Sequence, residues 1–323
     1  MKLPTSVNLD TSFKKDVYQG LTSYPKYLYS KYIYDQQGDK LFQQIMDLPE
    51  YYLTNCEFEI LQSQTDAIID SFCEGDQGFD LIELGAGDGK KTRLLLDRML
   101  QRKVDFVYKP IDISSHAIDS LATALEEEFP ALSLQPEVGA YFEVLSRLKS
   151  FGHRKKVILF LGSNIGNLLH PRAVTFLSQL QKNMNPADRV FIGFDQKKNP
   201  QTILDAYNDP QGVTEAFNKN LLHRINREFD ADFQVDNFKH WETYDPETGT
   251  AKSYLVATQP MKVSIDALDL EVELAAWETI HTEISQKYTD EVVNWLAEQA
   301  GLLIDTSFTD SQTYYKNYCF KTK

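Results

Sequence analysis

The chain has 323 residues, 42% hydrophobic and 25% charged, so it can bury a sizeable core as one large domain or two smaller ones. Its formal net charge of −14 argues against a surface for nucleic acid or anionic membrane, because phosphate contacts need clustered lysine and arginine. The longest apolar runs are too short to span a bilayer, and the N-terminus lacks the apolar core of a secretory signal. Cys56, Cys73 and Cys319 have no metal-ligand spacing, so we expect a cytoplasmic protein without a metal centre.

Residues 1–55 are rich in tyrosine, and the tyrosines at positions 24–34 could form the surface of an edge strand. Helical and strand patterns then alternate over residues 56–195. The predicted helices cover residues 56–72, 91–100, 117–129, 141–150 and 173–184, and the predicted strands cover residues 80–84, 106–113, 131–136, 156–162 and 188–195. This alternation predicts a parallel sheet with helices on both faces. The basic run at residues 153–156 is interpreted as a solvated loop before a strand.

Residues 196–283 break this rhythm and look like an α+β insertion. They contain a long helical pattern at residues 214–229, followed by strand-like runs at residues 238–245, 251–259 and 261–274. The chain then offers a helix at residues 289–301 and two strand-like runs at residues 302–310 and 313–322. A terminal hairpin of this kind is expected to complete the first sheet with an antiparallel edge.

A glycine-rich turn, LIELGAGDGKKTRLLL at residues 81–96, joins a buried strand to a helix. Gly85, Gly87 and Gly89 therefore lie where a doubly wound sheet binds nucleotides. A dinucleotide fingerprint requires a third glycine at the position of Lys90, so the pattern disfavours a ligand with a pyrophosphate. An NAD-dependent oxidoreductase is accordingly the weakest of the functions considered.

Two acids accompany this turn in the predicted sheet. Glu83 lies two residues before the first glycine, which suits a cofactor that carries an ammonium, a carboxylate and a sulfonium instead of a pyrophosphate. Asp112, near the end of the second strand, could accept two hydrogen bonds from ribose hydroxyls. S-adenosylmethionine (SAM) fits both features, although the same residues could merely form a tight turn and cap a helix.

Four further stretches are more specific than the fold: residues 31–61, FLGSNIGNL at residues 160–168, residues 205–233, and TEISQKY at residues 282–288. In this order they resemble the histidine N-alpha-methyltransferase family of ergothioneine biosynthesis, from about Lys15 to the C-terminus. The resemblance implies SAM-dependent methylation of the α-amino group of histidine, towards the trimethylated betaine, without a metal. It also implies an α/β, Rossmann-like methyltransferase domain (residues 56–195 plus 284–323) and an α+β substrate-binding domain (residues 1–55 plus 196–283).

The resemblance also implies roles for individual residues. On the cofactor side it points to Gly85, Lys91, Asp112 and Gly162, to which the turn adds Glu83, Gly87 and Gly89. On the substrate side, Tyr51 and Tyr207 match tyrosines that hold the carboxylate end, Tyr34 and Phe217 match aromatics that line the pocket, and Glu283 and Ser285 match the pair that grips the imidazole. Asn167 matches a residue near the substrate's amino and carboxylate groups. Together with Tyr34 it could orient the amine for the reaction.

Two departures from the family pattern concern the cofactor. Where members usually have an acid that holds the adenine amine, this chain reads VGAYFE, and Tyr141 occupies that place. Adenine recognition must then differ, by stacking or by a backbone contact. The turn GDGKKT also replaces a version that contains Ser or Thr and Glu. Neither departure touches the residues expected to meet the substrate.

Other interpretations stay open on the sequence alone. The enzyme could methylate another amino acid or an indole-type amine, or the chain could be a non-catalytic binding protein that retains the cofactor fold. Glu283 and Ser285 could belong to a solvated strand face, Tyr51 could pack at a domain boundary, and Asn167 could cap a helix. The expected partner is a small-molecule substrate, an amino acid with histidine favoured. No nucleic acid or membrane is expected, and a monomer suffices.

Overall fold

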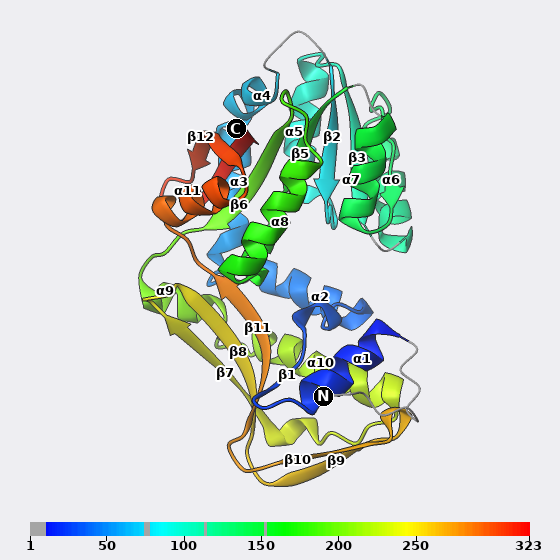
Figure 1. Cartoon of the computed structure of the whole chain (residues 1–323), viewed down its shortest axis with the longest axis vertical. Helices are drawn as coiled ribbons and strands as arrows, with labels where there is room; N and C mark the ends of the chain where they lie inside the picture. Colours follow the sequence, from blue (N-terminus) through cyan, green and yellow to red (C-terminus); the bar gives the residue numbers. More distant parts are fainter. Residues whose placement is uncertain (1–10, 74–77, 113–114, 152–153) are drawn as a thin grey trace. The chain divides into compact units, whose positions relative to one another are not determined.

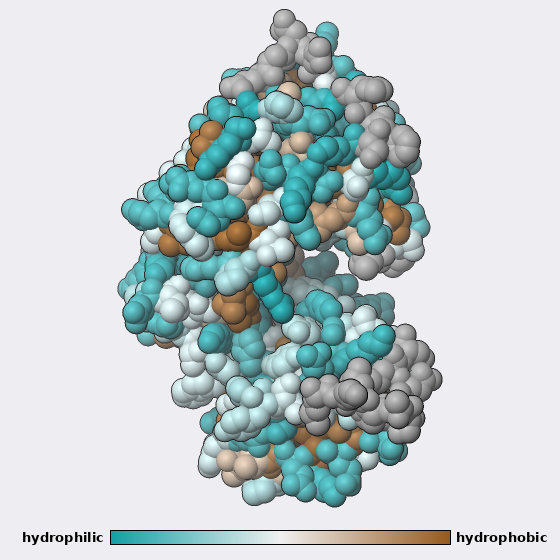
Figure 2. Space-filling model, in the orientation of Figure 1, coloured by the Kyte–Doolittle hydropathy of each residue, from teal (hydrophilic) through white to brown (hydrophobic). Residues whose placement is uncertain are grey.

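The computed structural model of the chain describes residues 11–73, 78–112, 115–151 and 154–323, which form two compact units (Figure 1). Unit 1 comprises Met1–Tyr52 and Lys198–Ser285, and unit 2 comprises Leu53–Lys197 and Gln286–Lys323. The assignment of one unit to the substrate and the other to the cofactor stays a prediction. Hydrophilic residues cover most of the face that Figure 2 shows. Within the described ranges, no helix is long and apolar enough to cross a membrane.

Unit 2 is built around a sheet that has seven strands among the described residues. Their order is β12 (Leu302–Thr309), β13 (Tyr315–Thr322), β6 (Arg189–Asp195), β5 (Lys155–Phe160), β2 (Phe79–Leu84), β3 (Phe106–Asp112) and β4 (Glu137–Val138). The strands from β6 to β4 are parallel, and β13 and β12 are antiparallel. The predicted antiparallel edge made by the C-terminal hairpin is therefore confirmed.

Helices cover both faces of this sheet (Figure 1). The helices of this unit are α3 (Tyr52–Ser63), α4 (Thr65–Phe72), α5 (Lys90–Gln101), α6 (Ser115–Glu128), α7 (Tyr141–Phe151), α8 (His170–Lys182) and α11 (Asp290–Gln299). Residues of α7, α8 and α11 share one core cluster with the inward side chains of Ile82 and Ile158. On the opposite face, Phe72 of α4 packs against Phe79 and Phe191. This cover on both faces explains why every residue of β2, β5 and β6 is buried.

Two predicted elements of unit 2 differ from the structure. The helix expected at residues 56–72 is two helices, because Gln64 leaves the helical conformation and its side-chain amide donates to the carbonyl of Thr309. The strand expected at residues 131–136 is reduced to one bridge between Leu134 and Tyr108. Pro110 of β3 has no backbone N–H that could continue the ladder beyond Tyr108, and only Glu137–Val138 pair again with β3.

The last two residues of the basic run at 153–156 are not part of a solvated loop. Residue 153 lies outside the described residues, but Lys155 and Lys156 open β5 and are buried. Lys156 forms an ion pair of 2.6 Å with the buried Asp188, and the ammonium of Lys155 donates to the carbonyl of Phe72. Both lysines are therefore bonded within the fold at the start of the strand, whereas the sequence predicted them to be in solvent.

Unit 1 has the α+β character expected of the insertion. Its main sheet has the order β1 (Lys26–Tyr27), β11 (Thr279–Gln286), β8 (Thr250–Ala257) and β7 (Phe238–Asp245), and β9 (Met261–Ile265) pairs with β10 (Leu270–Leu274). Its helices are α1 (Ser12–Leu21), α2 (Gln36–Met46), α9 (Pro200–Ala206) and α10 (Val213–Phe229). Helix α10 packs against β7, β8 and α2. Of the tyrosine-rich segment at positions 24–34, only Lys26–Tyr27 forms an edge strand.

Candidate active site

The glycine-rich turn of unit 2 follows β2 directly and leads into α5. Gly85, Gly87 and Gly89 have φ angles of 71°, 56° and 67°, in the left-handed region that side chains rarely adopt. Among the described residues, nothing lies within 4 Å of the place that a Cβ on Gly87 would take. The backbone there is open to a ligand, which is the arrangement that a glycine turn at the carboxyl end of a parallel strand provides for a nucleoside cofactor.

Glu83, at the end of β2, is only 4% exposed. The hydroxyl of Thr92 donates to its two oxygens at 2.7 and 2.8 Å, and the hydroxyl of Tyr108 also donates to it. Desolvation, aided by the charge of Glu57, raises the pKa of the Glu83 carboxyl to about 7. Glu83 is thus bonded within the fold, between β2, β3 and α5, and its direct contact with a cofactor stays a prediction.

The structure brings Tyr141 and Asp112 to the same turn. The hydroxyl of Tyr141, the first residue of α7, lies 2.7 Å from the place that a Cβ on Gly85 would occupy. Desolvation, followed by the charges of Asp112 and Glu83, raises the pKa of Tyr141 to about 12, so its phenol is neutral at physiological pH. A neutral phenol can donate a hydrogen bond, and the carboxylate of Asp112, at the end of β3, can accept hydrogen bonds from hydroxyls.

A second turn follows β5, next to β2 in the sheet. Gly162 has a φ of 76°, and a Cβ there would lie 3.9 Å from the ammonium of Lys91, so these two predicted cofactor residues are neighbours. Asn167 is exposed at the end of the 3-10 helix Asn164–Asn167. It does not cap α8, whose N-cap residue is Leu169 without a side-chain hydrogen bond. The capping alternative for Asn167 is therefore wrong.

In unit 1, four predicted substrate residues form one aromatic cluster. Tyr34 and Phe217 have ring centroids 5.4 Å apart, and Tyr51 and Tyr207 have theirs 6.2 Å apart. Phe42 of α2 joins the two pairs, at 5.8 Å from Phe217 and 6.3 Å from Tyr51. Sequence reasoning missed Phe42, although it is an aromatic residue inside the matching stretch 31–61.

Glu283 and Ser285 both lie in β11, so their side chains leave the same face of an extended strand, as predicted. The hydroxyls of Ser285 and Tyr207 are hydrogen-bonded at 2.7 Å. Tyr34 is 38% exposed as a residue, yet desolvation around its hydroxyl, followed by the charge of Glu283, raises the pKa of Tyr34 well above its ordinary value. Aromatic, hydroxyl and carboxylate groups are thus gathered in one region of unit 1.

Buried side-chain amides of α10 hold this region in place. The hydroxyl of Thr282 donates to Asn218 at 2.6 Å, which ties β11 to α10 beside Glu283 and Phe217. The amide of Asn220 donates to the carbonyl of Ile33 at 2.9 Å and to Asp35 at 2.8 Å, the two residues that flank Tyr34. Because both amides are buried, these bonds are costly to break and fix the geometry of the cluster.

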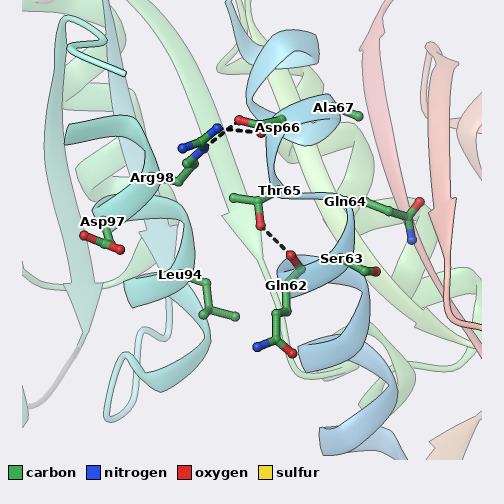
Figure 3. A pocket seen from close by; sticks show the side chains of 9 residues that line it. All are labelled: Gln62, Ser63, Gln64, Thr65, Asp66, Ala67, Leu94, Asp97 and Arg98. Atoms are coloured by element: carbon green, nitrogen blue, oxygen red, sulfur yellow. Dashed lines mark hydrogen bonds and ion pairs between the residues drawn. The ribbon is translucent and has the colours of Figure 1, made fainter. Parts of the chain in front are cut away.

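An open groove of about 510 Å³ lies on unit 2, between the α3–α4 junction and α5 (Figure 3). Arg98 of α5 and Asp66 of α4 bridge it with an ion pair of 2.8 Å. Most of the residues that line it are polar, and none of them is a predicted site residue. Over the described ranges, no group of three or more His, Cys, Asp or Glu side chains is arranged to hold a metal ion.

Comparison with known proteins identifies the family to which the chain belongs. Residues 13–322 match the family of histidine-specific, SAM-dependent methyltransferases. The chain belongs to this family. It is 38% identical over 291 residues to the histidine N-alpha-methyltransferase of Mycobacterium tuberculosis. The aligned region covers 90% of this chain and 89% of that protein. The same enzyme of Mycolicibacterium smegmatis is 38% identical over 301 residues, 93% of this chain and 91% of that protein.

A more distant relative is the ergothioneine biosynthesis protein 1 of Schizosaccharomyces pombe, 27% identical over 295 residues, 90% of this chain and 38% of that protein. The family resemblance inferred from the sequence is thereby confirmed, and the chain is a SAM-dependent methyltransferase. The residues of unit 2 also fit the cofactor chemically. The open backbone at Gly87 admits a ligand, Asp112 can accept from ribose hydroxyls, and Lys91 can pair with a carboxylate.

Proposed function

We propose that this protein transfers methyl groups from SAM to the α-amino group of histidine, towards the trimethylated betaine. In this proposal the cofactor-binding residues belong to unit 2, and the substrate-binding residues other than Asn167 belong to unit 1. The observation that carries this proposal is the pairing of Glu283 and Ser285 on one strand face, with Ser285 hydrogen-bonded to Tyr207 beside the aromatic cluster. When bound, SAM supplies an electrophilic methyl group on a sulfonium.

The cofactor is proposed to lie along the carboxyl edge of the sheet in unit 2. Gly85 and Gly87 let it approach the backbone, Asp112 accepts hydrogen bonds from its ribose, and Lys91 pairs with its carboxylate. The neutral hydroxyl of Tyr141, close to both Gly85 and Asp112, replaces the acid that other members use near the adenine. The role of Gly162 is to keep the turn after β5 open beside Lys91.

The imidazole is proposed to be gripped by Glu283 and Ser285. An imidazole has an N–H at one edge and an acceptor or a second donor at the other, which a carboxylate and a hydroxyl can match. Hydrogen bonds to a charged group contribute about 1.5–3 kcal/mol each. A site built on such groups rejects analogues that lack the partner atoms by roughly 10⁴-fold, and an indole would leave the carboxylate desolvated without a partner.

The amine is proposed to be oriented by Asn167 and Tyr34, while Tyr51 and Tyr207 bind the substrate carboxylate. Methyl transfer needs a neutral amine aligned with the methyl group, so one proton must leave before each transfer. Because the pKa of Tyr34 is raised, its phenol keeps its proton and acts as a hydrogen-bonding group, not as a general base. The proton passes to water, and positioning supplies most of the rate enhancement, up to roughly 7–11 kcal/mol.

Two variants with opposite effects test these assignments. Glu283→Ala should weaken histidine binding by about 10- to 100-fold, the equivalent of one charge-assisted hydrogen bond, and leave the affinity for S-adenosylhomocysteine (SAH) unchanged. Asp112→Ala should do the reverse. Both affinities are measured by calorimetry, with Glu273→Ala on the exposed side of β10 as the matched control. Equal losses of both ligands in Glu283→Ala would assign that residue a structural role.

The substrate itself is tested by mass spectrometry of the wild-type protein with SAM and a mixture of the twenty amino acids. Methylated histidine as the only product, with the trimethylated form accumulating, is the expected result. A parallel reaction contains an indole-type amine in place of the amino acids. Methylation of that amine, or of an amino acid other than histidine, would overturn the histidine assignment and leave the cofactor assignment intact.

A further inference from the structure

Unit 2 contains a buried carboxylate that has no role in the proposed site. Glu57 of α3 is 0% exposed, and four donors from three different parts of the unit converge on it. Its Oε2 accepts from the ammonium of Lys91 at 2.6 Å and from the backbone N–H of Gly162 at 2.8 Å. Its Oε1 accepts from the hydroxyl of Tyr315 at 3.2 Å and from the amide of Asn317 at 2.9 Å.

The surrounding chain makes room for this carboxylate. Gly193 of β6 lies beneath it, and a Cβ at that position would collide with Oε1 of Glu57 and with the hydroxyl of Tyr315. A buried charge is costly unless it is paired and fully hydrogen-bonded. Here the cost is met by one cation, Lys91, and three neutral donors. The arrangement is therefore a built network and not a chance contact.

The two donors to Oε2 come from the two turns at the carboxyl edge of the sheet. Lys91 lies in the first turn of α5, directly after the glycine-rich turn, and Gly162 follows β5, the strand beside β2. Parallel α/β sheets bind their ligands at this edge. Glu57 thus joins both cofactor turns through one carboxylate oxygen, from a helix that itself lies outside the turns.

Lys91 is held by Glu57 but is not enclosed by it. Its side chain is 19% exposed, whereas that of Glu57 is 0% exposed. An ammonium has three N–H donors, so one bond to Glu57 leaves donors for a second anion. A lysine side chain without such an anchor carries about 2 kcal/mol of rotamer entropy, which binding would have to remove. The carboxylate is the one anionic group of SAM, and a fixed ammonium is suited to it.

We propose that Glu57 is a positioning residue for the amino-acid end of the cofactor: it fixes the ammonium of Lys91 and the turn at Gly162 so that they receive the cofactor's carboxylate. This inference rests on the proposed cofactor role of Lys91. Glu57 acts through Lys91 and does not itself touch the cofactor. Because Tyr315 and Asn317 also bond to it, the competing explanation is a strut that only holds α3 against β13.

The choice of ligand separates these two explanations. SAH carries the amino-acid portion, and 5′-methylthioadenosine is the same thioether nucleoside without it. Calorimetry measures both affinities for the wild type, Glu57→Gln, Lys91→Met and the double variant. Lys90→Met controls for the loss of one positive charge, because Lys90 is a neighbouring lysine whose side chain is 69% exposed.

Glu57→Gln and Lys91→Met are each expected to weaken SAH binding at least 10-fold and to change methylthioadenosine binding less than twofold. The double variant should bind SAH no more weakly than Lys91→Met, because two residues that act as a unit are non-additive. If Glu57→Gln alone does not fold, the double variant compared with Lys91→Met carries the test, since removing both charges leaves no unpaired ion. Lys90→Met should leave both affinities unchanged.

Equal weakening of both ligands by Glu57→Gln, or a further loss on the Lys91→Met background, would make Glu57 a structural strut and overturn the inference. SAH affinity that falls in Lys91→Met but not in Glu57→Gln would also overturn it and leave the proposed cofactor site intact. Unchanged SAH affinity in Lys91→Met would overturn the cofactor role of Lys91 together with the inference. Histidine is absent from these measurements, so the substrate assignment is tested separately.

Discussion

The buried carboxyl of Glu83 makes the stability of unit 2 depend on pH near neutrality. Its pKa rises from the ordinary value of 4.5 to about 7, chiefly because desolvation penalises the charged form. At about 1.4 kcal/mol for each pKa unit, the folded state favours the protonated carboxyl by about 3 kcal/mol. The hydroxyls of Tyr108 and Thr92 lower the pKa in the same site, so the rise is the balance that remains after their hydrogen bonds.

The sign of the effect follows from proton linkage. In the unfolded chain Glu83 loses its proton near pH 4.5, whereas the folded protein keeps it up to about pH 7. The contribution to the free energy of unfolding is therefore full below about pH 4.5 and falls as the pH rises. It is lost once the pH passes about 7. Replacing the carboxyl by a neutral amide should remove this dependence.

The assay is a carbon-13 NMR titration of the side-chain carboxyls, in which the Glu83 resonance is identified by its absence from Glu83→Gln. A midpoint near pH 7 is expected. In urea unfolding, Glu83→Gln should be more stable than the wild type by up to about 3 kcal/mol at pH 8.5 and nearly equal to it at pH 5. Glu127→Gln, an exposed position on α6, should show no such difference. A midpoint below pH 5, or the same stability difference at both pH values, would refute the reasoning.

Two further predictions concern one hydrogen bond and one ion pair. Tyr207→Phe removes the 2.7 Å bond to Ser285 and should raise the histidine dissociation constant about 10-fold without changing SAH affinity, as calorimetry can check; an unchanged histidine constant would contradict the assignment. Lys287 and Asp195 form an ion pair of 2.7 Å, and both side chains are 0% exposed. Lys287→Met removes the cation of this pair and should lower the free energy of unfolding of unit 2 by about 3–5 kcal/mol, as urea unfolding can measure. Adding Asp195→Leu should recover most of that loss, and a single variant that costs under about 1 kcal/mol would show that the pair is dispensable.

The local patterns of the sequence were sufficient for the elements that depend on neighbouring residues. The βα alternation predicted the parallel sheet, the terminal hairpin predicted its antiparallel edge, and Gly85, Gly87 and Gly89 predicted a turn between β2 and α5. Glu283 and Ser285 share one face of β11 because a strand repeats every two residues. These features follow from backbone sterics and from the period of each element, which short stretches of sequence already contain.

Errors arose where a distant partner decided the conformation. Gln64 interrupts the helix predicted at residues 56–72 because its amide reaches Thr309, a residue 245 positions away. The basic residues Lys155 and Lys156 are buried because a carbonyl and a carboxylate from other elements accept from them. A local pattern indicates the polarity of a side chain, but it does not indicate which distant residue that side chain will contact in the folded protein.

The sequence by itself determined the family, the cofactor turn and the residues expected to meet histidine, because these are carried by short motifs in a characteristic order. Only the tertiary structure decided that Phe42 joins the aromatic cluster and that Glu57 connects Lys91 to Gly162. Glu57 lies 105 positions from Gly162 and 258 from Tyr315. The hydrogen-bond partners of Glu57 are determined by how α3 packs on the sheet, because this packing removes the carboxylate from water. No periodicity along the chain indicates which donors will then surround it.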